Sequence, residues 1–263
     1  MPPQVPQSTL DPDMSGKIQD FNRGVALAAE ELIFKTLPKK ILELQALIAE
    51  TDLESSEYSL SNIHTTTDVT VYPPPTSSSS NSSPDPKRRK RSVGDVSNGE
   101  PVATQDRDSG GAIYPQRVVA NHHIRKLQER NKLEFQALIE LCDKVKLWIN
   151  LTMPRIEDGD NFGVQIQEEV LNELGRAQES AYGLRDTMRV QHGNRAKICS
   201  KLIKYPNVED YVLALRDHDE KQLFMTRQHL HDVRNVYAIL FDILQKNIQK
   251  IRSPKGNNSL GMY

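Results

Sequence analysis

Apolar residues recur every three or four positions along four long stretches of the chain, which is the spacing that places them on one face of an α-helix. The first stretch covers residues 16–50. Pro38 predicts a kink or a short break at Leu37, because proline disfavours the helical conformation of the residue before it. The expected buried face of this helix consists of Ile18, Phe21, Val25, Ala28, Leu32, Ile41, Leu44, Leu47 and Ile48.

Three further helices are expected in the second half of the chain, over residues 116–152, 164–204 and 208–251. Asn207 is the expected N-cap of the last one, since Glu209 and Asp210 would then form an acidic first turn. The apolar stripes are Phe135, Leu138, Cys142, Val145 and Ile149; Val170, Leu174, Ala177, Ala181, Leu184 and Met188; and Leu230, Val233, Tyr237, Leu240, Leu244, Ile248 and Ile251.

Long helices joined by short turns pack side by side in alternating directions, at crossing angles of about 20°. The pattern therefore predicts an all-α fold, an elongated antiparallel four-helix bundle. Leu141 and Trp148 begin a second apolar face on the helix over residues 116–152. A bundle with such faces is expected to bury them against further copies of itself, which makes the protein a homo-oligomer.

Residues 51–115 differ in composition from the rest of the chain. The run from Tyr72 to Pro86 reads YPPPTSSSSNSSPDP, and it contains too few apolar residues to offset the entropy lost on ordering. We therefore expect a flexible linker over 51–115. It separates a first helix within 1–50 from three helices over 116–251, and a mobile tail follows over 252–263.

The charge and the chain ends exclude several classes of partner. The formal net charge is −1, so no overall field favours nucleic acid or a membrane surface. The N-terminus lacks the apolar core of a secretory signal, and no apolar run approaches the roughly 20 residues of a membrane span. We expect no membrane partner, no nucleic-acid binding, and free buried thiols at Cys142 and Cys199 in a reducing compartment.

Motifs typical of catalysis or metal binding do not occur in the sequence. It contains no GxSxG, no phosphate-binding loop, no GxGxxG and no HExxH. Histidines two positions apart, such as His229 and His231, do not share a helix face, so surface histidines are expected. We expect no enzyme activity, no cofactor and no metal.

The turn between the second and third expected helices, residues 154–164, is unusually rich in glycine and charge. One interpretation is an ordinary turn, which Pro154 opens and which Asp160 or Asn161 closes as an N-cap. Another is a calcium loop that starts at Asp158, with Asp160, Gly163 and Glu169 at its third, sixth and twelfth positions. Phe162 occupies the fifth position and offers no oxygen ligand. A calcium-responsive or purely structural bundle remains the alternative at this point.

Two further segments carry possible signals. Five consecutive cations in the linker, Lys87, Arg88, Arg89, Lys90 and Arg91, are typical of a nuclear import signal. The chain ends in Leu260, Gly261, Met262 and Tyr263, which would form either a frayed terminus or a segment whose free carboxylate is captured by a partner.

Four segments together resemble the 11S proteasome activator family: WINLTMPRIEDGDNFGVQIQEEV over 148–170, KYPNVEDY over 204–211, RNVYAILFDILQKNIQKI over 234–251, and Pro38–Lys40. The basic cluster in the linker is most like that of the nuclear gamma-type members, whereas the Gly-Met-Tyr ending looks more like the alpha type.

The resemblance implies a ring of seven bundles that sits on the outer-ring (alpha) subunits of the 20S proteasome and stimulates peptide hydrolysis without ATP. It implies that the tail Leu260–Tyr263 docks. It also implies that an activation loop opens the gate, formed by Arg155, Ile156, Glu157, Asp158, Gly159, Asp160, Asn161, Phe162 and Gly163. Asp160 departs from the asparagine common in that family. The expected location is the nucleus, with some protein in the cytoplasm.

Replacing Lys87 through Arg91 by neutral residues should shift the protein from the nucleus toward the cytoplasm while leaving the size of the assembly unchanged, because the linker lies outside the bundle. Fluorescence microscopy of tagged chains measures the first effect and gel filtration the second. Unchanged nuclear accumulation would contradict an import role.

Overall fold

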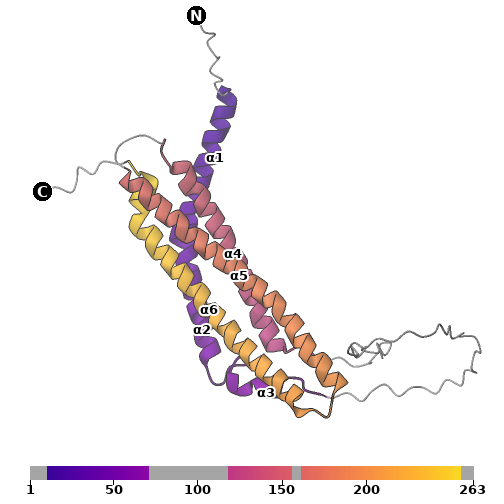
Figure 1. Cartoon of the computed structure of the whole chain (residues 1–263). Helices are drawn as coiled ribbons and strands as arrows, with labels where there is room; N and C mark the ends of the chain where they lie inside the picture. The colour runs from indigo at the N-terminus through magenta and orange to yellow at the C-terminus, as the bar shows by residue number, and fades with distance from the viewer. Residues whose placement is uncertain (1–10, 71–117, 156–160, 256–263) are drawn as a thin grey trace, which may run out of the picture.

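The computed structural model describes residues 11–70, 118–155 and 161–255. Within these ranges the chain is helical, and four long helical stretches lie side by side along an elongated body (Figure 1). The fold is the predicted all-α one. None of the helices in these ranges has the length and apolarity that crossing a bilayer requires.

The first helical stretch runs from α1 (Pro12–Glu31) through a π-helical turn (Leu32–Thr36) into α2 (Leu37–Asp52). Asp11 caps its start by accepting a hydrogen bond from the backbone of Asp13. A kink or a short break was predicted at Leu37, but the helical stretch continues through Leu37 and Pro38 without a break. Instead the backbone N–H of Leu37 bonds to the carbonyl of Leu32, one residue further back than in an α-helix, and this wider turn accommodates the proline.

The other three stretches are α4 (His122–Thr152), α5 (Phe162–Lys204) and α6 (Glu209–Arg252). At 1.5 Å per residue α5 and α6 are each about 65 Å long. Val208, rather than the predicted Asn207, is the N-cap of α6, and it makes no side-chain capping bond. The acidic residues Glu209 and Asp210 of the first turn favour this end through the helix dipole instead.

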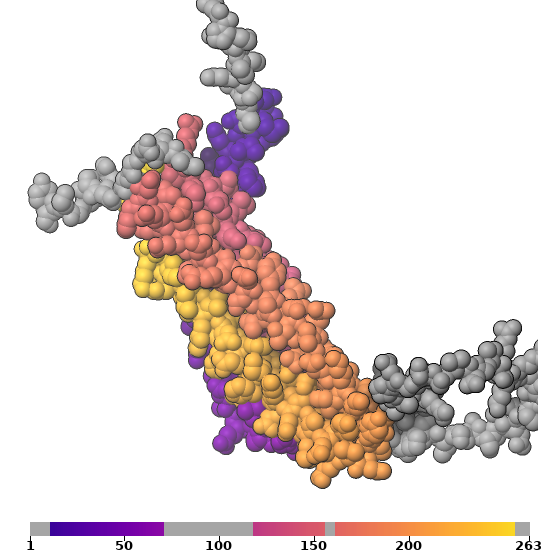
Figure 2. Space-filling view, viewed as in Figure 1, coloured from indigo at the N-terminus to yellow at the C-terminus, as the bar shows by residue number. Residues whose placement is uncertain are grey.

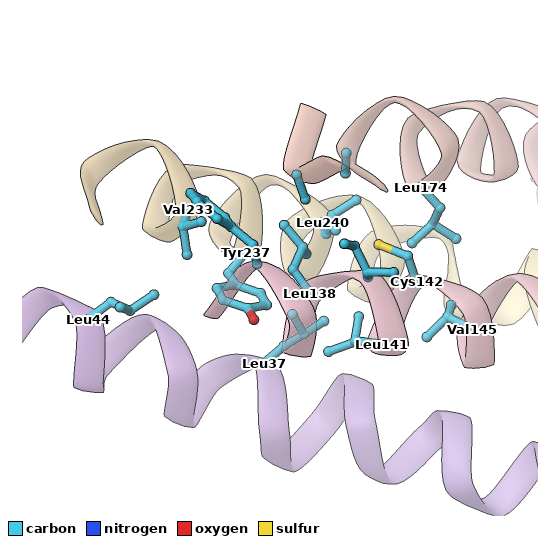
Figure 3. Packing of buried hydrophobic residues seen from close by; sticks show 14 of the residues in the cluster. Leu37, Leu44, Leu138, Leu141, Cys142, Val145, Leu174, Val233, Tyr237 and Leu240 are labelled. Atoms are coloured by element: carbon cyan, nitrogen blue, oxygen red, sulfur yellow. The ribbon is translucent and has the colours of Figure 1, made fainter. Parts of the chain in front are cut away.

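The core lies where α2, α4, α5 and α6 meet (Figure 3). Leu37 and Leu44 of α2 lie against side chains from α4 and α6, among them Tyr237, whose ring is fully buried. The predicted stripes of the last three helices are confirmed with the exception of Leu184, which is only half-buried; the α4 face of Phe135, Leu138, Cys142, Val145 and Ile149 is at most 1% exposed.

Charged and polar groups also lie inside the bundle. The side chain of Glu134 on α4 is 2% exposed and contacts Lys40 of α2 at 3.0 Å and Arg130 at 2.6 Å. Arg195 of α5 and Asp219 of α6 form a second buried pair at 2.8 Å. Buried ions are tolerated only with such partners, so these contacts tie the helices together at defined heights along the bundle.

The face predicted for the start of the first helix is wrong. Ile18 and Phe21 are 48% and 54% exposed, whereas Ala29, Ile33 and Leu37 are fully buried. The reason is that much of α1 projects beyond the body formed by the other helices (Figure 2). Ile18 and Phe21 therefore stay exposed, whereas Val25 and Leu32 of the same predicted stripe are partly buried against the core.

The first part of the expected linker over 51–115 is structured, contrary to the prediction. Residues 53–70 form turns, a short 3-10 helix (Leu60–Asn62) and α3 (Ile63–Thr66), which packs on α6. Tyr58 and Ile63 are 5% and 2% exposed, and Leu60 packs against the same core, so these residues anchor the stretch to the bundle. Residues 71–117, including Lys87–Arg91, lie outside the described ranges.

Both ends of the segment 71–117 are held at one place on the bundle. The backbone N–H of Val119 donates to Asp68 Oδ2 at 2.9 Å, and Asn121 Nδ2 donates to Thr66 Oγ1 at 2.9 Å. Nearby, Lys126 on α4 bonds to Glu57 at 2.8 Å, which lowers the pKa of the Glu57 carboxyl to about 2. The described residues on the two sides of this segment thus lie at adjacent, anchored points.

The thiols agree with the prediction, whereas one histidine does not. Cys142 and Cys199 are free and buried, and burial raises the pKa of Cys142 to about 12, so this thiol stays protonated. His229 was expected on the surface but is 5% exposed, with its ring against Phe135 at 6.2 Å between centroids. Burial lowers the pKa of His229, because the charged form is poorly solvated there.

Ile63→Ala should lower the free energy of unfolding by about 2–5 kcal/mol, because it leaves a cavity beneath α3. Urea denaturation at one fixed protein concentration measures this. Leu53→Ala is the matched control, since Leu53 is 57% exposed and should change the free energy by no more than about 0.5 kcal/mol. Equal effects from the two variants would show that residues 53–70 are not part of the packed bundle.

His229 should make the protein less stable in mild acid. The folded chain holds it neutral, so its contribution is complete above the ordinary histidine pKa of about 6.5 and is lost as the pH falls below that value. His229→Leu should therefore show a smaller fall in melting temperature between about pH 7.5 and about pH 5.5 than the wild type. Thermal unfolding followed by circular dichroism tests this, and an identical fall in both chains would contradict it.

Candidate functional site

One end of the bundle carries both the α4–α5 turn and the end of α6 (Figure 1). Helix α4 ends at Thr152, and Met153 follows in an extended conformation. Helix α5 begins at Phe162 after the N-cap Asn161, which makes no side-chain capping bond. Helix α6 ends at Arg252. The end of α4, the start of α5 and the end of α6 therefore lie in one region of the bundle.

Gly163 lies directly against the chain that follows α6. A Cβ atom at Gly163 would lie 2.1 Å from the carbonyl oxygen of Pro254 and 2.6 Å from its Cα, so no other residue fits. Both residues are buried. The start of α5 and the root of the C-terminal segment are therefore in backbone-to-backbone contact.

Gln167 joins the three helix ends. It is fully buried, and its amide nitrogen donates to the carbonyl of Ile251 in α6 at 2.9 Å and to Thr152 Oγ1 in α4 at 3.2 Å. Its Oε1 has no hydrogen-bond partner in the described part of the chain. A buried acceptor without a hydrogen bond lowers the stability of the fold by about 1–3 kcal/mol. An apolar side chain at this position would avoid that cost.

The outer surface of this end is aromatic and cationic. Phe162 is 57% exposed, and Lys250 Nζ lies 5.9 Å from the centroid of its ring. On the neighbouring side Arg252 bonds to Glu30 of α1 at 2.8 Å and lies over the ring of Phe34. Among the described residues there is no cluster of histidine, cysteine and carboxylate side chains that could hold a metal. The arrangement is that of a contact surface.

The calcium interpretation of this turn is wrong. An EF-hand loop needs its glycine, at the sixth position, to form a sharp turn in the chain. Here α5 already begins at Phe162, so Gly163 and Glu169 are both helical. The two residues cannot serve as the sixth and twelfth positions of such a loop.

The described ranges contain only part of the predicted site. The structure places Arg155, Asn161, Phe162 and Gly163 at this end of the bundle. Residues 156–160, the tail residues 260–263 and the basic residues 87–91 lie outside the described ranges, so their roles stay predictions.

Sequence reasoning missed Gln167 and Pro254 as members of this site. A signal for Gln167 was present, because it continues the stripe of Val170, Leu174 and Ala177 at the same spacing of three and four residues. A polar residue in line with buried apolar ones is a candidate for a buried hydrogen bond. The position of Pro254 against Gly163 has no comparable local signal.

Comparison with known protein families and sequences gives matches over nearly the whole chain. Residues 12–74 match the family model described as "Proteasome activator PA28, N-terminal", and residues 117–261 match "Proteasome activator PA28, C-terminal". The chain is 34% identical to proteasome activator complex subunit 3 of Gallus gallus, with 97% of this chain and 98% of that protein covered. The corresponding Homo sapiens subunit is 33% identical over the same shares.

Solved structures give the same likeness in three dimensions. The 11S subunit of the Plasmodium falciparum proteasome, PA28, matches with a TM-score of 0.66 and 30% identity, covering 97% of this chain and 100% of that one. A chain from the archaeal 20S proteasome in complex with mutated P26 activator matches with a TM-score of 0.55 at 13% identity. This second match shows a similar fold and nothing more.

Proposed function

The chain belongs to the PA28 family of proteasome activators, which are non-catalytic regulators. On that basis we propose that several copies form a ring, that the ring docks on the 20S proteasome, and that it opens the proteasome's gate. In this proposal the C-terminal residues 260–263 bind the outer-ring subunits. The loop of residues 155–163 then contacts the same subunits and favours the open gate. Peptide hydrolysis is stimulated, and the chemistry belongs entirely to the proteasome.

The observation that carries this proposal is the placement of the loop base and the tail root at one end of the bundle. Gly163 at the end of the loop contacts Pro254, which lies just after α6. Five residues separate Pro254 from Leu260, so a tail and a loop that start at adjacent points can reach one partner surface. Two contacts from one end are what docking and opening require.

The exposed apolar stripe of α1 supports assembly of several copies. Met14, Ile18 and Phe21 lie on one face of α1 at spacings of four and three residues, and they are 51%, 48% and 54% exposed. Soluble chains rarely leave such a continuous stripe uncovered. In the proposed ring a neighbouring copy covers this part of α1, which explains why it projects beyond its own bundle (Figure 2).

A ring gives the weak contact of one short tail its strength. Tethered copies act at high effective concentration, so the combined affinity exceeds that of one tail by roughly 10²–10⁴. Gate opening needs a further element, because a ligand shifts an equilibrium only by its different affinities for the two states. The loop supplies that difference in this proposal, and no nucleotide hydrolysis is involved.

Asn161→Tyr should separate docking from opening. Asn161 is exposed just before α5, so a bulky side chain there alters the loop contact without disturbing the core. The variant ring should bind 20S proteasome with affinity close to the wild type, compete with it, and stimulate hydrolysis of fluorogenic peptides at least about tenfold less. A pull-down and a peptidase assay on one preparation measure both quantities.

A chain truncated after Ser259 is the matched comparison, because it removes the tail and leaves the loop. It should keep the size of the ring and lose binding to 20S proteasome. Parallel loss of binding and activity in Asn161→Tyr would show that the loop is only part of the dock. Full activity in that variant would mean that residues 155–163 are only a turn.

A further inference from the structure

We propose that Gly163 and Gln167 are positioning residues, which lock the root of the C-terminal tail against the base of the activation loop so that docking of the tail fixes where the loop lies. This inference rests on the proposed function and adds a mechanism to it: the tail and the loop act as one body. It assigns a role to Gly163 that needs no contact with the partner, because Gly163 is buried at the end of the loop, and a role to Gln167, which lies outside both the loop and the tail.

The backbones at Gly163 and Pro254 are packed so closely that no side-chain atom fits between them. A methyl group at Gly163 would come within 2.1–2.7 Å of three backbone atoms of Pro254. A flexible side chain could swing away from such a clash, but backbone can only shift as a unit. A displacement of the tail root is therefore passed to the first turn of α5.

Glycine at this position is required by the contact alone. Gly163 is the second residue of α5 and has an ordinary helical conformation, in which alanine is favoured over glycine. The other described glycines of α5 are Gly175, Gly183 and Gly193, and a Cβ atom at each would meet nothing within 4 Å. Among the glycines that the structure describes, Gly163 alone has a neighbour that excludes a side chain.

Gln167 extends the lock by one helical turn. It lies four residues after Gly163, on the same face, and bonds to the last turn of α6 through Ile251 and to the last turn of α4 through Thr152. The hydroxyl of Thr152 in turn donates a hydrogen bond to the carbonyl oxygen of Ile149 at 2.9 Å. The two sides of the loop and the root of the tail thus share one buried hydrogen-bond network.

Its unpaired Oε1 points to a role other than stability. The residue is fully buried, yet one of its two polar atoms has no partner in the described part of the chain. A methionine of similar volume would fill the same space without an orphaned acceptor. What only an amide can supply here is the pair of donated bonds that join α4 and α6.

Gly163→Ala tests the lock, with Gly175→Ala on the same helix as its matched control. Both chains should assemble to the wild-type size. The Gly163 variant should bind 20S proteasome within about threefold of the wild type, yet its peptide hydrolysis at saturating ring should fall at least about fivefold. The Gly175 variant should match the wild type in both. A loss confined to the saturated rate is what a loop out of position produces.

Hydrogen–deuterium exchange of the free ring gives a readout that needs no proteasome. Gly163→Ala should speed exchange of the peptide covering 245–255 at least about threefold, while the far end of α5 is unchanged. Gln167→Met should act in the same direction on exchange and on the saturated rate. Its control is Gln165→Met, since Gln165 is exposed on the same helix.

The outcomes separate the lock from the proposed function. Wild-type exchange at 245–255 in both Gly163→Ala and Gln167→Met would overturn the lock, even if the wild-type ring activates the proteasome. Binding and saturated rate that fall together in Gly163→Ala would overturn it as well. A wild-type ring that fails to stimulate 20S proteasome would overturn the proposed function itself.

Discussion

The axial alignment of the helices depends on a buried carboxylate, that of Glu134, which lies between Lys40 of α2 and Arg130 of its own helix. Apolar stripes alone permit helices to slide by one turn, about 5.4 Å, because one leucine can take the place of the next. Such a slip would separate Glu134 from Lys40, and breaking a buried pair costs about 3–5 kcal/mol. The pair of Arg195 and Asp219 imposes the same constraint between α5 and α6.

Fixed alignment along the bundle fixes the helix ends. A slip of one turn would carry Ile251 about 5.4 Å away from Gln167, and neither their hydrogen bond nor the contact of Gly163 with Pro254 would survive it. The Arg195–Asp219 pair, which lies near the opposite end of α5 and α6, therefore helps to fix the position of Gln167 relative to Ile251. A non-catalytic regulator acts through the position of the residues that contact its partner. The geometry of the end that carries Gln167 is therefore as important to its function as a catalytic site is to an enzyme.

The sequence predicts the last three helices well and the first one only in part. Strict spacing places residues such as Leu138 and Leu174 on buried faces, and these predictions are confirmed. The stripe of Ile18 and Phe21 is just as regular, but regularity does not say whether an apolar face meets its own chain or another copy. His229 and Gln167 show the second limit, since the burial of a polar residue is decided by what the neighbouring helices place around it.

Hydrogen bonds from Asn121 to Thr66 and from Val119 to Asp68 hold the two ends of the segment 71–117 close together. Closing a longer loop costs little more entropy than closing a shorter one, so length and composition can change there at almost no cost to folding. The hydrogen bonds at Thr66 and Asp68 therefore hold Asn121 and Val119 in place whatever number of residues connects the two ends.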